Sequence, residues 1–440
     1  MALGNAKSLW EAALVLLRQH DALATRTPRD DPWSPEYDRW RIMSTEARMR
    51  FRQDHPLLTD DQRNFISVAT AHGSDDVACY ALGWAVDIEA WPHFSYSWES
   101  TLQLVAGRHR LTEGEPFPVT DVDLELLHGA TPLPRPAAKR SPRRGELPHI
   151  RLYERPQGID IEAIFDFNFK HGLWAALSEL DWLGSEHPNV DLDEFDIPAT
   201  NSVFPVVVRD PARQFSKIVK ALPELVSKRA VFVLPELSVT PEIVDRLRSY
   251  LDENHPYEDW LVVAGSYHTQ TTGVQKNVSC ALVPGWPDVM QHSKLVRFTN
   301  ELSRSAPSAE GIEEGHQLVV YCADPFRFSI LICKDLLDPD IARHVAFVGV
   351  NVLGVPSMSE KTHDFEARVH AFVTDTQGFA VVANGPLEWR GVVVDPCAVF
   401  GRPLENERVT SRSPGVSRPA RPVAHLVSSS GSSGNSVDLG

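Results

Sequence analysis

Three reactive side chains follow apolar, strand-like segments in the second half of the sequence. Glu236 comes after AVFVLP, Lys294 lies in QHSKLVRF, and Cys333 ends RFSILIC. In layered α/β folds, side chains at the carboxyl ends of strands converge on the ligand crevice. Each residue alone has an ordinary explanation, as a solvated loop glutamate, a surface lysine or a packed cysteine. Together the three are less ordinary, and they make thiol chemistry a candidate function.

The segments around these residues alternate between strand and helix patterns from about residue 201. Residues 230–234 (AVFVL) and 260–265 (WLVVAG) are typical of buried strands. Asp210 and Thr240, each followed by proline, are N-cap residues of helices whose apolar residues repeat at helical spacing. Further strands are expected at 203–208, 278–283, 327–333, 351–355 and 379–383. This alternation predicts a layered α/β architecture in which helices cover a sheet.

Residues 201–405 resemble the nitrilase, or carbon–nitrogen hydrolase, superfamily. VFVLPELSVT resembles the strand of that family that ends in Pro-Glu, and QHSKLVRF resembles its lysine segment. ILICKDLLDP resembles its nucleophile segment, and 39 residues separate Lys294 from Cys333, as the family leads one to expect. Three motifs in this order carry more weight than one short match. The resemblance implies an αββα sandwich in the C-terminal half, preceded by a mixed, helix-containing N-terminal domain of unknown fold.

The resemblance also implies roles. A thiol with an ordinary pKa near 8.5 is mostly protonated at neutral pH, so Cys333 needs a base to act as a nucleophile. Glu236 takes that role by resemblance. Lys294 and the backbone N–H of Lys334 would stabilise the oxyanion of an amide-like substrate. Neither a metal nor an organic cofactor is required.

Many members of the family have a second glutamate between the lysine and the cysteine. Glu301 is the natural candidate, because it follows Lys294 by seven residues. The nearby alternatives are Glu310, Glu313 and Glu314.

Other residues near these motifs are expected to shape the site. Asp335 occupies the position of a common family acid and is expected to shape the turn after Cys333, and Asn277 belongs to the supporting context. Members that cleave nitriles tend to have Cys-Trp-Glu at the nucleophile. This chain has Cys333-Lys334-Asp335, which looks more like the amidase and carbamoyl-hydrolase branches.

Composition limits the class of protein. The chain has 440 residues with 43 basic and 59 acidic side chains, and the formal net charge is −16. This length suggests two or three domains, and the acidic balance argues against broad nucleic-acid binding. No apolar run approaches the roughly 18 to 20 residues that span a bilayer, and residues 1–10 lack a signal-peptide pattern, so a cytoplasmic location is expected.

The cysteines show no spacing that predicts a bridge or a metal. They lack CxxC pairs, which fits neither a disulfide framework nor a zinc site. The five are Cys79, Cys280, Cys322, Cys333 and Cys397.

The Pro- and Arg-rich stretch at residues 132–148 predicts an exposed linker or loop. It follows an N-terminal domain of unknown function, residues 1–131. The remaining segments are expected to be a connecting helical segment (149–200), a nitrilase-like domain (201–427) and a flexible Ser/Gly tail (428–440).

Three functional hypotheses remain open. The first is a hydrolase of small amide-like substrates, and the resemblance implies a homodimer or higher oligomer. In the second, the N-terminal region docks a protein partner and controls the hydrolase domain, because about 200 residues are enough for a domain. The third is a non-catalytic scaffold with the same fold.

Overall fold

A computed structural model describes the protein in two compact units. One unit contains residues 1–112, 119–155 and 347–349, and the other contains residues 113–118, 156–346 and 350–440. The described residues are parts of 6–16, then 34–53, 57–70, 76–90, 116–118, 160–165, 180–197, 205–269, 274–285, 290–300, 308–323, 326–347, 350–376, 378–402, 410–412, 423–428 and 436–438. The predicted linker at 132–148 lies outside them.

Where the first unit is described, its longest helices are α2 (Pro35–Phe51), α3 (Asp60–Thr70) and α4 (Asp76–Ala90). Ser34 caps α2, because its hydroxyl oxygen accepts a hydrogen bond from the backbone N–H of Tyr37 at 3.1 Å. Trp40 of α2 packs edge-on against Trp84 of α4, with ring centroids 5.6 Å apart. The N-terminal region is therefore helix-containing, as expected.

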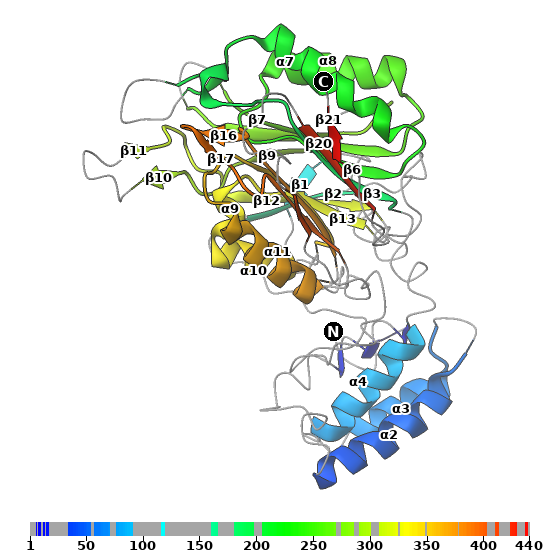
Figure 1. Ribbon diagram of the computed structural model, residues 1–440. Coiled ribbons are helices and arrows are strands. Elements are labelled where there is room, and N and C mark those ends of the chain that lie inside the picture. Colours follow the sequence, from blue (N-terminus) through cyan, green and yellow to red (C-terminus); the bar gives the residue numbers. More distant parts are fainter. Residues whose placement is uncertain are drawn as a thin grey trace. The chain divides into compact units, whose positions relative to one another are not determined.

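The second unit is built on two large sheets (Figure 1). The seven-stranded sheet has the order β21 (Ser436–Asp438), β20 (Val423–Ser428), β3 (Trp182–His187), β6 (Ala230–Val233), β7 (Trp260–His268), β8 (Asn277–Leu282) and β9 (Met290–Ser293). The eight-stranded sheet has the order β1 (Pro116–Pro118), β2 (Asp160–Phe165), β12 (Gln317–Ala323), β13 (Phe326–Ile330), β14 (Val352–Ser357), β15 (Phe379–Asn384), β18 (Ala398–Gly401) and β19 (Thr410–Arg412).

The two sheets pack face to face. Strands β14 and β15 contact β3, β6 and β7 of the other sheet, and β12 contacts β9. A Cβ atom on Gly354 would lie only 2.7 Å from Val263 Cγ2, so the sheets approach too closely there for a larger residue. The central strands are accordingly apolar on both faces, as in other covered parallel sheets.

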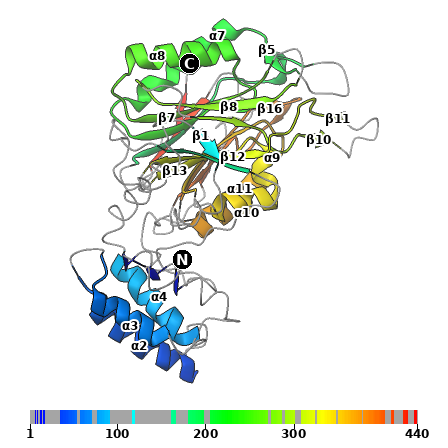
Figure 2. The same ribbon diagram turned by 180° about the vertical axis from the view of Figure 1, so that it is seen from behind.

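Helices cover the outer faces of both sheets (Figures 1 and 2). Helices α7 (Pro211–Ala221) and α8 (Pro241–Asn254) lie on the seven-stranded sheet. Helices α9 (Lys334–Leu337), α10 (Pro339–Phe347) and α11 (His363–Thr376) lie on the other side. The unit is therefore an αββα sandwich, which confirms the expected fold class.

The caps of α7 and α8 are the residues that the sequence predicted. The Asp210 carboxylate accepts from the Arg213 N–H at 2.9 Å, and the Thr240 hydroxyl accepts from the Ile243 N–H at 3.3 Å. The apolar face of α8 packs into the core with Ile243, Val244, Leu247 and Leu251 buried.

The shorter elements are η5 (Leu192–Glu194), η6 (Leu222–Leu225), and the two-stranded pairs β4 (Phe195–Asp196) with β5 (Val207–Val208), β10 (Thr299–Asn300) with β11 (Ser308–Ala309), and β16 (Glu388–Trp389) with β17 (Val392–Val393).

The described parts of the segment at 149–200 differ from the expected connecting helix. They include β2 in one large sheet and β3 in the other, while residues 166–179 lie outside the described residues. The sequence WLGSEH in β3 contains polar residues, but the strand lies between β20 and β6, where Ser185, Glu186 and His187 are all buried. A polar strand that is buried by its neighbours has no alternating apolar pattern to reveal it.

The C-terminal tail also contributes to the sandwich. Strand β21, within the predicted tail at 428–440, pairs with β20. Among the described residues, no helix has the length and apolar character needed to cross a membrane.

Candidate functional site

Glu236 lies just beyond the end of β6, between the two sheets. The backbone N–H of Glu236 donates to the Ser357 carbonyl at the end of β14, at 3.2 Å, so the turn joins one sheet to the other. Leu237, the next residue, has a φ of 59°, which is the left-handed region. Glu236 itself is buried, with 3% of its surface exposed. Its position is therefore fixed by backbone contacts rather than by a flexible loop.

Lys294 follows β9 and places its ammonium group between two carboxylates. The Nζ atom lies 2.7 Å from Glu236 Oε1 and 2.7 Å from Glu310 Oε2. The Lys294 backbone N–H donates to the Asn277 carbonyl at 2.9 Å. With 2% exposure, the ammonium group is held in a medium where ion pairs are poorly screened.

Cys333 occupies the sharp turn between β13 and α9. Its φ of 50° and ψ of −103° are unusual for a residue with a side chain. Two contacts with β14 hold it: the Cys333 N–H donates to the Pro356 carbonyl at 2.8 Å, and the Ser357 hydroxyl lies 3.5 Å from Cys333 Sγ. The thiol is also close enough to the carboxylate of Glu236 and the ammonium group of Lys294 for their charges to shift its pKa. The structure thus brings together Glu236, Lys294 and Cys333.

The backbone N–H of Lys334 is the first of helix α9. Such N–H groups have no partner within the helix and carry a positive partial charge. This position, beside Cys333, is where the sequence expectation placed the oxyanion donor. The Lys334 ammonium group points elsewhere, because its Nζ donates to Thr299 Oγ1 at 3.1 Å.

Within the described residues, the second glutamate that contacts Lys294, besides Glu236, is Glu310, which follows the β10–β11 hairpin. Glu301, the residue favoured from the sequence, lies outside the described residues. The Glu310 carboxylate also accepts from the Phe298 N–H at 3.0 Å and contacts His268 Nε2 at 2.8 Å. It is therefore fixed on several sides around Lys294.

His268 and Asn277 orient these carboxylates. The Val206 N–H donates to His268 Nδ1 at 3.0 Å, so Nδ1 has no proton and Nε2 carries the proton that is donated to Glu310. Asn277 donates from Nδ2 to Glu236 Oε1 at 2.9 Å and to Glu310 Oε1 at 2.8 Å. These contacts join the two carboxylates in one buried network.

Asp335 joins the cysteine turn to the lysine segment. Its carboxylate accepts from the backbone N–H groups of Leu295 at 2.9 Å and Val296 at 2.7 Å. It also accepts from the Ile332 N–H at 3.0 Å and contacts His292 Nε2 at 3.3 Å. Because these four contacts occupy both oxygens of the carboxylate, Asp335 is not placed to transfer protons. It holds the turn at Cys333 against the segment that contains Lys294.

We therefore expect Asp335→Asn to lower the free energy of unfolding by about 2–3 kcal/mol, because an amide nitrogen cannot accept and several buried N–H groups lose their partner. Urea unfolding measures the change. Asp340→Asn, at an exposed aspartate five residues away, is the matched control and should change stability by less than about 0.5 kcal/mol. Equal effects of the two substitutions would show that the Asp335 contacts are dispensable.

Burial and charge set the protonation of the site. Burial raises the pKa of Cys333 to about 12, and the Glu236 charge adds to this effect. Burial also raises the pKa of Glu236, while Lys294 opposes that rise. Burial alone would lower the pKa of Lys294, but Glu236 and Glu310 outweigh it and hold that pKa well above its ordinary value. The resting site therefore contains a protonated thiol and a charged ammonium group.

Burial would likewise raise the pKa of Glu310, but Lys294 and the His268 hydrogen bond outweigh it and hold that pKa far below its ordinary value. Glu310 is therefore a permanent anion beside Lys294. The pKa of Glu236, by contrast, is raised above its ordinary value.

Comparison with other proteins gives structural matches only. No protein-family model matches the sequence, and no curated protein matches it. Solved structures of nitrilase-superfamily amidases are similar to the C-terminal part of this chain.

Three examples are structures of the amidase of Nesterenkonia sp. AN1. The NitN amidase is 15% identical, with a TM-score of 0.41, over 56% of this chain and 91% of that chain. A mutant described as an amidase from the nitrilase superfamily is 16% identical, with a TM-score of 0.41, over 57% and 90% of the two chains. A third structure, 17% identical with a TM-score of 0.41 over 56% and 92%, holds acrylamide added at the active-site cysteine of that enzyme.

Two residues of the network were missed in the sequence. His268 lies at the end of β7 without a motif around it, and Ser357 ends β14 in the segment GVNVLGVPS. A polar residue that ends an otherwise apolar strand is the signal that could have identified both.

Proposed function

We propose that this chain is a thiol-dependent hydrolase of non-peptide carbon–nitrogen bonds, of the amidase or carbamoyl-hydrolase type, within the nitrilase superfamily. The observation that carries the proposal is the convergence of Glu236, Lys294 and Cys333 from three separate strand ends on one buried network. The order of the three motifs in the sequence agrees with this function.

In the first half of the reaction, Cys333 Sγ attacks the carbonyl carbon of the amide while its proton passes to Glu236. The thiol pKa of about 12 means that little thiolate exists beforehand, so this transfer must accompany the attack. The carbonyl π electrons move to the oxygen, where Lys294 Nζ and the Lys334 N–H stabilise the negative charge. The C–N bond then breaks, the nitrogen takes the proton from Glu236, and a thioester remains.

In the second half, water hydrolyses the thioester. Glu236 removes a proton from the water molecule while the water oxygen attacks the thioester carbon. The C–S bond breaks, the carboxylic acid leaves, and the proton returns from Glu236 to Cys333 Sγ. Glu310 keeps its charge throughout and holds Lys294 in its ammonium form. Each half releases one product. Because the last proton returns to Cys333 Sγ, the enzyme ends the cycle in its starting protonation state.

Ammonia release from a panel of small amides, carbamoyl compounds and nitriles tests the proposal. We expect turnover of amides or carbamoyl compounds and little turnover of nitriles, because Lys334 and Asp335 follow the nucleophile. Mass spectrometry of the enzyme with a slow substrate should show the acyl group on the peptide that contains Cys333. A panel without any turnover, in an enzyme shown to be folded, would refute the proposal.

We further expect kcat/KM to fall on the acid side with a midpoint above pH 4.5. The base must be a carboxylate, and burial raises the pKa of Glu236 above its ordinary value of 4.5. Activity is therefore present above the raised pKa and lost as the pH falls through it. The measurement is kcat/KM against pH, with circular dichroism as the control for folding. A profile that stays flat to below pH 4.5 would contradict the assignment of Glu236 as the base.

A second candidate, a sensor and effector protein, is favoured by the division into two compact units. In this proposal the N-terminal unit binds a protein partner and changes the activity of the sandwich. A chain cut at residue 201 would not test it, because β1, β2 and β3 belong to the large sheets. A chain that begins at residue 113 keeps these strands and removes residues 1–112 of the N-terminal unit, and its activity relative to the full chain is the test. Equal activity, with or without a cell extract, would argue against control by the N-terminal unit.

A further inference from the structure

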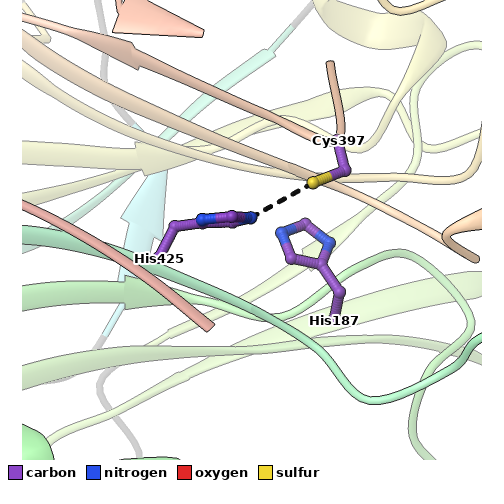
Figure 3. Close-up of side chains that lie close together, drawn as sticks. All are labelled: His187, Cys397 and His425. Atoms are coloured by element: carbon purple, nitrogen blue, oxygen red, sulfur yellow. Dashed lines mark hydrogen bonds between the residues drawn. The ribbon is translucent and has the colours of Figure 1, made fainter. Parts of the chain in front are cut away.

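A second cluster of reactive side chains lies between the two sheets, apart from Cys333. His187 ends β3, His425 lies in the adjacent strand β20, and Cys397 directly precedes β18 of the other sheet (Figure 3). All three are buried, with 0%, 1% and 0% exposure. One potential ligand atom from each residue lies within 4.8 Å of the other two, and His425 Nε2 is 3.3 Å from Cys397 Sγ.

The backbone fixes the tautomer of His187 in a form that can bind a metal. His187 Nδ1 lies 2.9 Å from the carbonyl oxygen of Asn384, and a carbonyl only accepts, so Nδ1 carries the proton. The lone pair is therefore on Nε2. An imidazole whose other N–H donates to a backbone carbonyl is the usual arrangement of histidine ligands in metal sites, because that bond orients the ring.

We propose that His187, Cys397 and His425 bind a zinc ion through two imidazole nitrogens and one thiolate. In a tetrahedral zinc site with Zn–S of about 2.3 Å and Zn–N of about 2.0 Å, neighbouring ligand atoms lie about 3.5 Å apart. The His425–Cys397 separation of 3.3 Å already meets this spacing, and the others, all within 4.8 Å, need contraction by about 1.5 Å at most. The fourth position goes to water or to the Ser185 hydroxyl, which lies 3.1 Å from His187 Nε2.

The donor atoms select the class of metal. Two imidazoles and a thiolate suit zinc, whereas magnesium and calcium prefer oxygen ligands. Binding deprotonates the thiol of Cys397, so each zinc ion taken up releases one proton and the affinity rises with pH. The bond that forms is Zn–S, and the proton goes to solvent.

The consequence of binding is a link between the sheets. Strands β3 and β20 are antiparallel neighbours in the seven-stranded sheet, and Cys397 directly precedes β18 of the eight-stranded one. The Asn384 carbonyl that orients His187 ends β15, where Asn384 is paired with Ser357 beside the thiol of Cys333. The zinc ion therefore supports the region behind the candidate active site without taking part in the reaction.

Metal titration of the full chain, after removal of metals with a chelator, tests the proposal. We expect about one equivalent of Zn²⁺ and a rise in Tm on binding. With Co²⁺ as the probe, a thiolate-to-metal charge-transfer band should appear. Cys397→Ala and His425→Gln should abolish the band, whereas two variants of buried cysteines elsewhere, Cys280→Ala and Cys333→Ala, should retain it.

X-ray absorption at the zinc edge of the unmodified protein gives a readout that does not depend on the folding of a variant. The expected first shell has one sulfur at about 2.3 Å and two imidazole nitrogens at about 2.0 Å. An oxygen-only shell, the absence of zinc binding, or a charge-transfer band that persists in Cys397→Ala would overturn the proposal. In each of these outcomes the three side chains are a hydrogen-bonded part of the core.

Discussion

Cys333→Ala is expected to lower kcat/KM for amide hydrolysis by on the order of 10³-fold or more. Alanine removes the only atom that can form the thioester, while the carboxylates and the ammonium group stay in place. Steady-state ammonia release measures the loss, and mass spectrometry should show that no acyl group is retained. The protein should stay folded, because a cysteine replaced by alanine loses one buried atom.

The control for this substitution is Cys280→Ala. Cys280 is a buried cysteine in β8 and is not among the residues described above as contacting Lys294. We expect its replacement to leave kcat/KM within about twofold, since it removes packing but no reacting atom. If Cys333→Ala and Cys280→Ala retain the same activity, Cys333 is not the nucleophile.

Lys294→Met should lower both the stability and the activity. Methionine has a similar volume, but it leaves the buried carboxylates of Glu236 and Glu310 facing each other without the cation. Removing one partner of a buried ion pair costs about 3–5 kcal/mol. Urea unfolding measures this cost, and kcat/KM should fall by on the order of 10²-fold or more because an oxyanion donor is lost.

A companion variant separates these two effects. Adding Glu310→Gln to Lys294→Met neutralises one of the unpaired carboxylates, so stability should recover in part while activity stays low. Lys361→Met, at an exposed lysine, is the matched control and should change stability by less than about 0.5 kcal/mol. A stable and active Lys294→Met enzyme would exclude the proposed role of the ammonium group.

The parts of the fold that the sequence predicted are those with strong local signals. Helices α7 and α8 begin with an N-cap and a proline and carry an apolar stripe, so their start is decided within a few residues. The strands before Glu236 and Cys333 are continuous apolar runs, which are typical of covered sheets. Because each reactive residue directly follows such a run, its place at a strand end could also be predicted.

Other parts depend on contacts between distant segments. Strand β3 was expected to be part of a helical segment, because its polar residues are buried only by β20 and β6. Among the glutamates after Lys294, spacing favoured Glu301, which lies outside the described residues, whereas Glu310 contacts the ammonium group in the part of the chain that is described. The pairing of β10 with β11 places Glu310 next to Lys294, and no local pattern in the sequence predicts this contact.

The sequence alone determined the order of the three motifs, the reactive residue types and the helices whose caps are local. Only the tertiary structure decided which of these side chains share a charge network, because a contact such as Lys294 with Glu310 depends on how separate segments pack. The same holds for His187, Cys397 and His425. Cysteine spacing gave no sign of a zinc site, since the ligands come from β3, from β20 and from the residue before β18, which are far apart in the chain and meet only where the two sheets pack together.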